Sequence, residues 1–355
     1  MLPLTKDKPK ALLKYQGETL LERIVKQVSS RGITRVSVVV GHGERKVVAK
    51  LKEYDHLDIA LIKNKRFRED KNILSLTLAL RKRLMPFVLI EADTIISDAC
   101  FDEIVNPEDR RSLWFTTGPF VSGMYGGIVK VDGHRRVVDL RIVPEYQDSY
   151  RGYSKMTGLL KVGPDQLERY YELLVEACEQ DTNQYYHAPW IRHLEELPSY
   201  AVDLSGCGVM SLNTVEEYHA ALGISLVDVD KLRPIEGHSS KRAKWLQNKI
   251  AKEGVWRKPL AVEKDAYLVM DGMHRLEVAK KLNLARVPCQ MFPYEAVKVW
   301  SLRKQYHVTR ETVTRRALAG DIYPYKTAKH GFPVPIHECC YYLEELADSK
   351  GVGVK

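Results

Sequence analysis

The chain has 355 residues, with 55 Lys and Arg against 46 Asp and Glu, and 45% of its residues are hydrophobic. This length predicts two domains, and the composition is that of an ordinary globular protein, which excludes disordered, collagenous and fibrous chains. No stretch reaches the roughly 18 consecutive apolar residues of a membrane span, and the N-terminus lacks the apolar core of a signal peptide. We therefore expect a cytoplasmic protein with no membrane partner.

The cysteines and the charges add two expectations. Six cysteines are spread along the chain without a CxxC pair, so the sequence indicates neither a zinc site nor a disulfide framework, and we expect buried free thiols. Residues 1–225 contain 31 basic and 31 acidic side chains, whereas residues 226–355 contain 24 and 15. The whole excess of +9 lies in the last third, which favours a phosphate-bearing ligand there over a general affinity for nucleic acid.

The first two thirds alternate helix-like and strand-like patterns, which predicts a parallel α/β sheet. The predicted elements in chain order are a helix at 19–30, a strand at 35–40, helices at 45–51 and 72–84, strands at 87–91 and 124–131, and a helix at 167–179.

A second pattern begins near residue 224 and places a new unit there. We divide the chain into domains 1–222 and 223–355 and expect an α+β fold in the second. Its predicted elements are a strand at 225–229, a helix at 240–253, strands at 259–262 and 266–270, a helix at 273–282, a strand at 287–292 and a basic helix-like stretch at 308–318.

Two polar positions of the first domain are candidate site residues. Lys10 lies in a basic loop before a helix, where its ammonium could contact a polyphosphate or remain solvated. Asp93 follows the apolar strand 87–91, at the carboxyl edge of the predicted sheet, where ligands of open α/β sheets bind. Its carboxylate is suited to the Mg²⁺ of a nucleotide, and capping of the following turn is the alternative.

The segments PLTKDKPKALL, RVSVVVGHG and FVLIEAD together resemble the sugar-phosphate nucleotidyltransferase family, over roughly residues 1–222. The resemblance implies a Rossmann-like mixed sheet, phosphate contacts by Lys10 and Mg²⁺ binding by Asp93. The family's first strand and glycine-rich loop would lie just before Pro3, so we expect that part of the nucleotide cradle to be missing. A second metal-binding Asp of the family corresponds to Asn213 in this sequence.

Two further segments, 64–67 and 72–75, resemble the substrate side of phosphocholine-type members of that family. This likeness implies a small phosphorylated alcohol as the substrate of the first domain, rather than a hexose phosphate. CTP or another nucleoside triphosphate would be its co-substrate.

The run Asp271-Gly272-Met273-His274-Arg275 follows a predicted strand and opens a predicted helix. Glycine permits the tight turn, and the free N–H groups of a helix start form an anion site that His274 or Arg275 can reinforce. Asp271 could bind Mg²⁺ or orient a hydroxyl group, and the alternative is an N-cap. The sequence therefore predicts a phosphate site at this turn.

Two other segments of the second domain carry candidate residues. Glu236 comes at the end of a strand that Pro234 stops, where a carboxylate is usually only solvated. The basic segment 320–330 contains Lys326 and several other phosphate donors, among them Thr327 and His330.

The ordered segments LRPIE, GVWRKPL, YLVMDGMHR, VPC and GDIYPYKTAKH resemble free L-serine kinases of the ParB/sulfiredoxin-like fold, from about residue 226 to 333. The resemblance implies that Glu236 is the catalytic base and that Asp271 binds Mg²⁺ and orients the hydroxyl group. Met273 replaces a His of the family. The implied nucleotide and phosphate contacts are Gly272, Met273, His274, Arg275, Lys326, Thr327 and His330.

Together these resemblances predict an enzyme that phosphorylates free L-serine, or a similar small amino alcohol, with ATP or ADP and Mg²⁺. The fused nucleotidyltransferase-like domain could activate the product with CTP. The alternative is a ParB-like CTP- or DNA-binding regulator, whose relatives carry a helix-turn-helix where this chain shows one helix-like stretch, 308–318. We expect small-molecule substrates and nucleotides as partners rather than nucleic acid, and the chain could form a homodimer.

Overall fold

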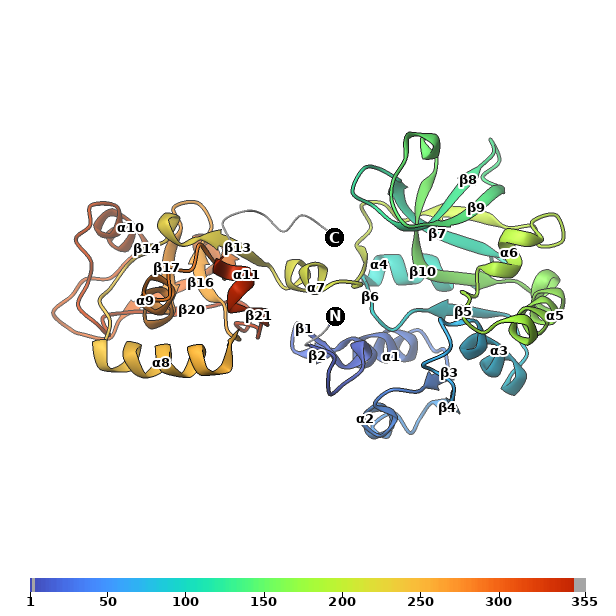
Figure 1. Ribbon diagram of the computed structural model, residues 1–355, viewed down its shortest axis with the longest axis horizontal. Coiled ribbons are helices and arrows are strands. Elements are labelled where there is room, and N and C mark those ends of the chain that lie inside the picture. The colour runs from blue at the N-terminus through green and yellow to red at the C-terminus, as the bar shows by residue number, and fades with distance from the viewer. Residues whose placement is uncertain (2–3, 348–355) are drawn as a thin grey trace. The chain divides into compact units, whose positions relative to one another are not determined.

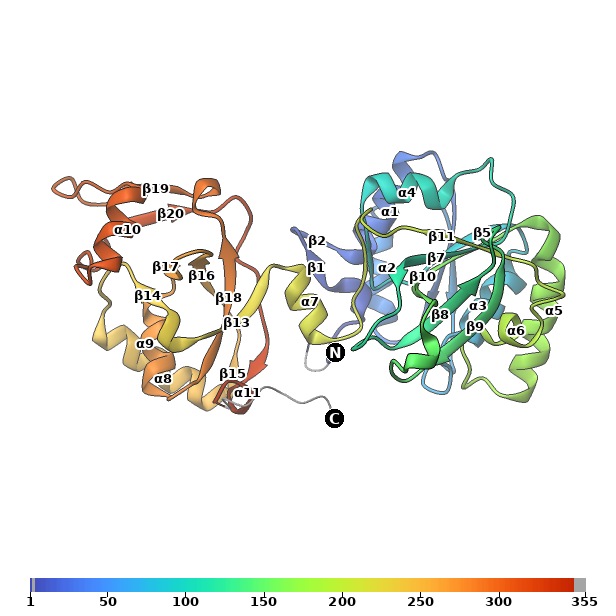
Figure 2. The ribbon, with the colours of Figure 1, turned by 90° about the horizontal axis from the view of Figure 1, so that it is seen from above.

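The computed structural model describes residue 1 and residues 4–347 (Figures 1 and 2). The chain forms two compact units, the first made of Met1–Lys14 and Glu18–Asn213, and the second made of Tyr15–Gly17 together with the described residues from Thr214 onward. We call them unit 1 and unit 2. The short helix α7 (Val215–Ala221) falls in unit 2, and the domain boundary that the sequence predicts at residue 222 stays a prediction. Among the helices described, none combines the length and apolarity needed to cross a bilayer.

Unit 1 is a mixed α/β fold. Its strands are β1 (Lys14–Tyr15), of which only Lys14 belongs to unit 1, β2 (Glu18–Thr19), β3 (Arg35–Val40), β4 (Asp58–Lys63), β5 (Phe87–Ile90), β6 (Thr94–Ile96), β7 (Leu113–Pro119), β8 (Gly126–Val131), β9 (Val137–Val143), β10 (Ser154–Val162), β11 (Tyr200–Asp203) and β12 (Val209–Ser211). Its helices are α1 (Leu20–Ser30), α2 (Glu44–Leu51), α3 (Ile73–Lys82), α4 (Asp98–Val105), α5 (Pro164–Gln180) and α6 (Ala188–Arg192).

The central sheet of unit 1 runs in the order β11-β7-β10-β8-β9, with β5 also paired to β10. Strand β10 is antiparallel to β5, β7 and β8, whereas β11 is parallel to β7, and β3 and β4 form a separate parallel pair. The prediction of a parallel sheet from the alternating pattern is therefore wrong for the central sheet. The short β8–β9 connection joins neighbouring strands without a crossover helix, which permits antiparallel pairing only. The mixed sheet implied by the nucleotidyltransferase resemblance is confirmed.

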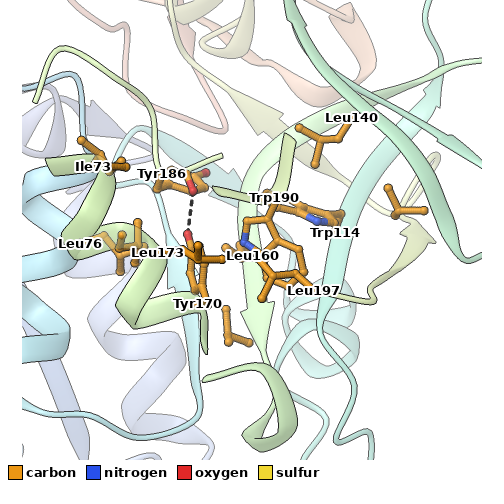
Figure 3. Packing of buried hydrophobic residues seen from close by; sticks show 14 of the residues in the cluster. Ile73, Leu76, Trp114, Leu140, Leu160, Tyr170, Leu173, Tyr186, Trp190 and Leu197 are labelled. Atoms are coloured by element: carbon orange, nitrogen blue, oxygen red, sulfur yellow. Dashed lines mark hydrogen bonds between the residues drawn. The ribbon is translucent and has the colours of Figure 1, made fainter. Parts of the chain in front are cut away.

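A core rich in aromatic residues packs α3, α5 and α6 against this sheet (Figure 3). Trp114 of β7, Tyr170 of α5 and Trp190 of α6 are completely buried. The Tyr170 hydroxyl donates to the backbone oxygen of Tyr186 at 2.8 Å, so this polar group is paired within the core. Large rings of this kind contribute much of the burial energy of a core, and here they fix the segment around Tyr186.

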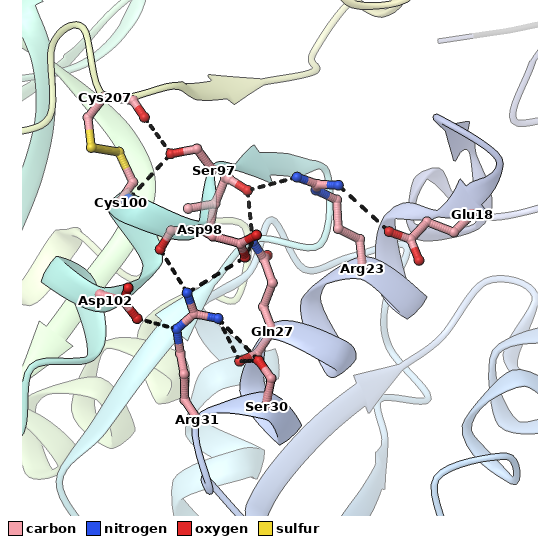
Figure 4. Close-up of polar contacts among 11 residues, drawn as sticks. Glu18, Arg23, Gln27, Ser30, Arg31, Ser97, Asp98, Cys100, Asp102 and Cys207 are labelled. Atoms are coloured by element: carbon pink, nitrogen blue, oxygen red, sulfur yellow. Dashed lines mark hydrogen bonds and ion pairs between the residues drawn. A yellow bond between two sulfur atoms is a disulfide. The ribbon is translucent and has the colours of Figure 1, made fainter. Parts of the chain in front are cut away.

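Arg31, which follows α1, ties that helix to α4 (Figure 4). Its guanidinium donates to the backbone oxygen of Asp98 at 2.8 Å, pairs with Asp102 and lies 4.9 Å over the Phe101 ring. Such a network is stronger than an isolated surface ion pair because several groups hold one planar cation.

One cysteine expectation is wrong, because Cys100 of α4 and Cys207 form a disulfide (Figure 4). The two residues are 107 positions apart, and folding brings their Cα atoms to 5.7 Å, within the range a disulfide requires. Nothing in their spacing indicates the pairing, since it depends on the loop before β12 returning to α4. The other four cysteines are free thiols.

Gly163 caps α5 where only a glycine fits. A Cβ atom placed on Gly163 would lie 2.0 Å from the backbone oxygen of Arg110. Because backbone atoms cannot move aside cheaply, we expect Gly163→Ala to lower the free energy of unfolding by about 2 kcal/mol or more. Chemical denaturation followed by tryptophan fluorescence measures the change. The matched control is Gly133→Ala, where a Cβ meets nothing within 4 Å, and an equal loss in both variants would contradict this reading.

Unit 2 is built on a five-stranded mixed sheet in the order β13-β18-β16-β17-β14. Its strands are β13 (Ile224–Asp228), β14 (Arg233–Pro234), β15 (Val255–Trp256), β16 (Leu260–Glu263), β17 (Leu268–Asp271), β18 (Arg286–Phe292), β19 (Lys298–Ser301), β20 (Ala328–Gly331) and β21 (Tyr341–Tyr342). Its helices after α7 are α8 (Ser240–Glu253), α9 (Met273–Lys281), α10 (Arg310–Leu318) and α11 (Leu343–Ala347).

Helices α8 and α9 pack against each other beside this sheet (Figure 2). Helix α8 begins after Ser239, whose hydroxyl accepts from the backbone N–H of Arg242, and ends at Gly254 in a left-handed conformation. Both ends follow ordinary capping rules. The α+β fold predicted for the second part of the chain is confirmed.

Candidate active sites

In unit 1 the structure brings Lys10 and Asp93 together, although they are 83 positions apart. Asp93 lies between the ends of β5 and β6, and the Lys10 ammonium is 2.8 Å from its carboxylate. Both side chains remain partly accessible, so the pair is not sealed in the core. A cation and a carboxylate at this edge can neutralise a phosphate and hold a metal ion respectively.

Asn213 is brought to the same place by the pairing of β12 with β6. Ser211 lies opposite Thr94, and the backbone N–H of Leu212 donates to the backbone oxygen of Asp93 at 3.0 Å. The next residue is Asn213, an amide at the position where the nucleotidyltransferase resemblance implies a second carboxylate.

Glu91 is a site residue that the sequence analysis did not single out. Its carboxylate is mostly buried and accepts from the side-chain amide of Asn72 at 3.3 Å. Burial, and then the charge of Asp93, raise the pKa of Glu91 to about 7, although a hydrogen bond from Tyr186 acts in the opposite direction. The signal in the sequence is a Glu that directly extends an apolar strand toward Asp93.

In unit 2 the run from Asp271 forms the predicted strand–turn–helix. Asp271 ends β17, and Gly272 precedes α9 with φ of +109°, a conformation that favours glycine. A Cβ there would also lie 3.1 to 3.2 Å from Arg275 and Leu260. Met273 has its side chain buried, so its contribution to the turn is the backbone N–H at the start of α9.

Arg275 points inward. Its guanidinium donates to the backbone oxygens of Lys258 and Pro259 and to the carboxylate of Asp271 at 2.8 Å. Burial lowers the pKa of Arg275 from its usual value, against the charge of Asp271. In this arrangement Arg275 positions Asp271 and the segment before β16.

Glu236 binds the backbone of the segment at residues 326–328, which carries Lys326. One carboxylate oxygen accepts from the backbone N–H of Lys326 at 3.2 Å, and the other accepts from those of Thr327 and Ala328 at 2.9 and 3.0 Å. A carboxylate has about four acceptor sites, so three are engaged and one is left for a ligand.

The turn that Glu236 holds has a restricted conformation. Lys326 adopts φ of +60°, which is uncommon for a residue with a side chain. The Thr327 hydroxyl donates to the backbone oxygen of Pro324 at 2.7 Å, and Arg303 donates to the backbone oxygens of Tyr325 and Lys326. Lys326 thus extends from a turn fixed on both sides, whereas Thr327 is fully buried and closes that turn.

His274 contacts two segments besides its own helix. Its Nε2 accepts from the backbone N–H of Ser239, and the Tyr325 ring lies edge-on at 5.3 Å. Burial, and then the charge of Arg242, lower the pKa of His274. The start of α8, the start of α9 and the turn at residues 324–328, which we call the late turn, therefore meet at His274. Of these residues the sequence analysis missed Ser239 and Arg242, for which the pattern Ser-Ser-Lys-Arg before a helix is the available signal.

His330 is buried on β20 and does not offer a charge to a phosphate. Its Nε2 lies 3.0 Å from the Tyr294 hydroxyl, and burial lowers its pKa to about 4 despite the charge of Asp271. The imidazole is therefore neutral near pH 7.

This burial of His330 predicts a pH dependence of stability. The pKa of His330 in the unfolded chain is about 6.5. Between this pH and about 4, the imidazole is therefore protonated mainly in the unfolded state and neutral in the folded state. We expect the free energy of unfolding to fall as the pH decreases from about 6.5 toward 4, by up to about 3 kcal/mol from this residue. Urea unfolding of the wild type and of His330→Gln between pH 7.5 and 4.5 measures the difference. Parallel pH profiles of the two proteins would contradict it.

Each of the two candidate sites contains a carboxylate, Asp93 in unit 1 and Asp271 in unit 2, of the kind that binds Mg²⁺. Among the described residues no group of three or more His, Cys, Asp and Glu side chains could hold a metal ion. Mg²⁺ commonly binds through one or two carboxylates together with water and substrate phosphates, so such a cage is not required. Asp93 and Asp271 provide oxygen donors of that kind.

Comparison with known proteins points to two classes, cytidylyltransferases and serine kinases. A 2-aminoethylphosphonate cytidylyltransferase of Lancefieldella rimae is 32% identical over 116 residues, which are 32% of this chain and 45% of that protein. An ATP-dependent L-serine kinase of Staphylothermus marinus is 42% identical over 73 residues, which are 19% of this chain and 29% of that protein. These matches thus span less than half the length of either relative. No protein-family profile matches the chain.

Among solved structures, the CTP:phosphocholine cytidylyltransferase LicC of Streptococcus pneumoniae superposes with a TM-score of 0.54 at 18% identity. The superposition covers 62% of this chain and 91% of that chain. Because unit 2 makes up a smaller share of the chain than that, the superposed region includes residues of unit 1. At this identity it shows the fold, which is that of a nucleotidyltransferase. The chain therefore resembles a nucleotidyltransferase and a serine kinase joined in one polypeptide, as the sequence motifs indicate.

Proposed function

We propose that the chain is a bifunctional enzyme with domains 1–222 and 223–355. The second domain transfers a phosphoryl group from ATP or ADP to the hydroxyl group of free L-serine or a similar small amino alcohol. The first domain couples the phosphorylated product to CTP or another nucleoside triphosphate. The observation that supports the kinase proposal is that Glu236 holds the turn at Lys326, and that the neighbouring Tyr325 ring lies against His274, in the first turn of the helix that Gly272 precedes.

In the proposed kinase step, the serine oxygen attacks the terminal phosphorus of the nucleotide. The new O–P bond forms as the bond to the leaving nucleotide oxygen breaks, and Glu236 accepts the hydroxyl proton at its remaining acceptor site. Asp271, oriented by Arg275, would hold Mg²⁺ and the hydroxyl group, and bound Mg²⁺ would neutralise phosphate charge. Lys326 and the backbone N–H groups of Gly272 and Met273 would bind phosphate oxygens.

In the proposed second reaction, a phosphate oxygen of the product attacks the α-phosphorus of CTP, and the bond to pyrophosphate breaks. Lys10 would contact the phosphates and Asp93 would hold Mg²⁺. The supporting observation is the 2.8 Å contact between Lys10 and Asp93 at the strand edge, together with the local similarity to a cytidylyltransferase.

A regulator that binds CTP or DNA remains the second candidate function, because free serine kinases and ParB-like proteins share a fold. One observation disfavours DNA binding of that type. Helix α10 is followed by strand β20 rather than by a second helix within the described residues, so this stretch does not form a helix-turn-helix. Salt-sensitive binding of duplex DNA by the full chain would favour the regulator.

Incubation of the protein with Mg²⁺, L-serine and either ATP or ADP tests the kinase proposal. We expect O-phosphoserine, detected by ³¹P NMR, and its absence with both nucleotides would overturn the kinase assignment. Addition of CTP together with O-phosphoserine tests unit 1 separately. We expect pyrophosphate release, and its absence would remove cytidylyl transfer to this substrate without affecting the first result.

A further inference from the structure

Helix α8 carries a strongly basic outer face that neither proposed reaction uses. The helix buries Ala243 and Ile250 within unit 2, and Figure 1 shows it at the border of that unit. Its acidic residue, Glu253, is paired at 3.1 Å with Arg257, just beyond the helix. Its five basic residues are Lys241, Arg242, Lys244, Lys249 and Lys252. The helix therefore has a net charge of +4, almost half of the +9 excess of the chain.

Trp245 lies at the outermost position of this helix. It is 61% exposed, the largest value for any large hydrophobic residue in the described part of the chain. An α-helix turns by about 100° per residue, so Trp245 points away from both Ala243 and Ile250. Contact with water explains exposed lysines, whereas an exposed indole ring forfeits the burial energy that large rings contribute. This position is therefore unusual for a face that contacts only water.

Three lysines surround the Trp245 ring on the helix surface. Lys241 and Lys249 lie four residues before and after it, and Lys252 lies seven residues after it, which are the spacings of one helix face. All three lysines are exposed, and Lys249 Nζ lies 5.7 Å from the centre of the indole ring. Within the described residues, no carboxylate forms an ion pair with Lys241 or Lys252. Their charges are therefore available to an anionic partner.

These four side chains can meet a flat surface at the same time. All lie within about 40° of the direction of Trp245, along roughly 16 Å of the helix axis. A bilayer with anionic head groups offers such a surface, because lysines bind its charges and an indole ring prefers the boundary between head groups and acyl chains. A nucleic acid offers similar charges, but a single aromatic ring provides little of the base stacking that single strands require.

We propose that the outer face of α8, formed by Lys241, Trp245, Lys249 and Lys252, docks the protein reversibly on the surface of an anionic lipid membrane. The indole ring enters the head-group region, and the lysine side chains extend to the lipid phosphates and carboxylates. The expectation of no membrane partner rests on the lack of a spanning segment, and a helix that lies on the surface needs none.

Co-sedimentation of the full-length protein with lipid vesicles tests this proposal. The probes are vesicles of phosphatidylcholine alone and of phosphatidylcholine with about 30% phosphatidylserine. At about 0.1 M salt we expect at least tenfold tighter binding to the anionic vesicles. Because salt screens exposed charges, this preference should weaken as the salt concentration rises to about 0.5 M. Equal binding to both kinds of vesicle, or no binding at millimolar lipid, would overturn the proposal.

Substitutions on α8 locate the contact. The triple variant Lys241→Gln, Lys249→Gln and Lys252→Gln removes three charges from the proposed face. Each lysine near an anionic surface contributes about fivefold to binding, so we expect a loss of about 100-fold. Trp245→Ala removes the indole ring, and we expect a loss on the order of tenfold. Unchanged binding by both variants would overturn the proposal.

Matched controls remove the same groups from exposed positions of unit 2 outside α8. One is the triple variant Lys264→Gln, Lys298→Gln and Lys304→Gln, and the other is Trp300→Ala. Both should bind anionic vesicles within about twofold of the wild type, and thermal unfolding verifies that every variant folds. An equal loss in the two triple variants would attribute binding to net charge alone and overturn the role of α8.

A nucleic-acid arm separates the membrane from the other anionic partner. Fluorescence anisotropy with a labelled DNA duplex and a labelled single strand, under the same salt conditions, gives their dissociation constants. We expect weaker binding to both than to anionic vesicles, with little effect of Trp245→Ala. Tighter binding to either nucleic acid that is lost in the α8 variants would assign this face to nucleic acid and overturn the membrane proposal.

Discussion

Glu236→Gln is expected to lower kcat for serine phosphorylation by at least about 100-fold. The neutral amide cannot accept the hydroxyl proton as the O–P bond forms, so phosphoryl transfer would proceed without a general base. The rate of O-phosphoserine formation at saturating nucleotide and serine measures the loss. Glu295→Gln, an exposed glutamate of the same unit, is the matched control and should keep the wild-type rate.

The same substitution has a second expected effect, because Glu236 accepts three backbone N–H groups of the late turn. Glutamine retains one acceptor oxygen and turns an NH₂ group toward the remaining donors. We expect the free energy of unfolding to fall by about 1–3 kcal/mol. Glu236→Asp separates the two roles, since it retains a base on a shorter side chain. A wild-type kcat in a destabilised Glu236→Gln protein would show that Glu236 only positions Lys326, and that the base lies elsewhere.

The helices and strands that the sequence analysis predicted form within a few residues of the expected bounds. The helix expected at 240–253 forms with those bounds, because Ser239 is a strong helix-start signal and Gly254 a strong helix-stop signal. The helix expected at 167–179 runs from Pro164 to Gln180, since proline is favoured in the first turn of a helix. The phosphate turn at Asp271 was also predictable, because strand, glycine and helix follow one another directly in the chain.

What could not be predicted depends on contacts between distant segments. Strands β7, β10 and β11 were missed, and their pairing joins residues 113–119 with 154–162 and 200–203. The sequence identifies Glu236 as a carboxylate at a strand end, but its partners lie about 90 positions away. The inward orientation of Arg275 likewise follows from the backbone oxygens of Lys258 and Pro259, which no motif reveals.

Asp93→Asn is expected to lower cytidylyl transfer by at least about 100-fold while serine phosphorylation continues at the wild-type rate. The substitution removes the carboxylate proposed to hold Mg²⁺ and also leaves the Lys10 ammonium without its ion-pair partner. Pyrophosphate release and O-phosphoserine formation, measured on the same preparation, give the two rates. Because the kinase rate is an internal control for folding, an equal loss of both activities would contradict the assignment of Asp93 to a separate metal site.

Asn213→Asp provides the converse test at the neighbouring position. The pairing of β12 with β6 brings residue 213 next to Asp93, so the new carboxylate would add a second charged oxygen donor for the same ion. We expect the Mg²⁺ concentration that half-saturates pyrophosphate release to fall on the order of tenfold, since ligand charge strengthens cation binding. In Asn213→Gln, which adds no charge, this half-saturating Mg²⁺ concentration should not fall. If Asn213→Asp instead raises it, then two adjacent carboxylates repel without sharing an ion, and the metal site does not extend from Asp93 to β12.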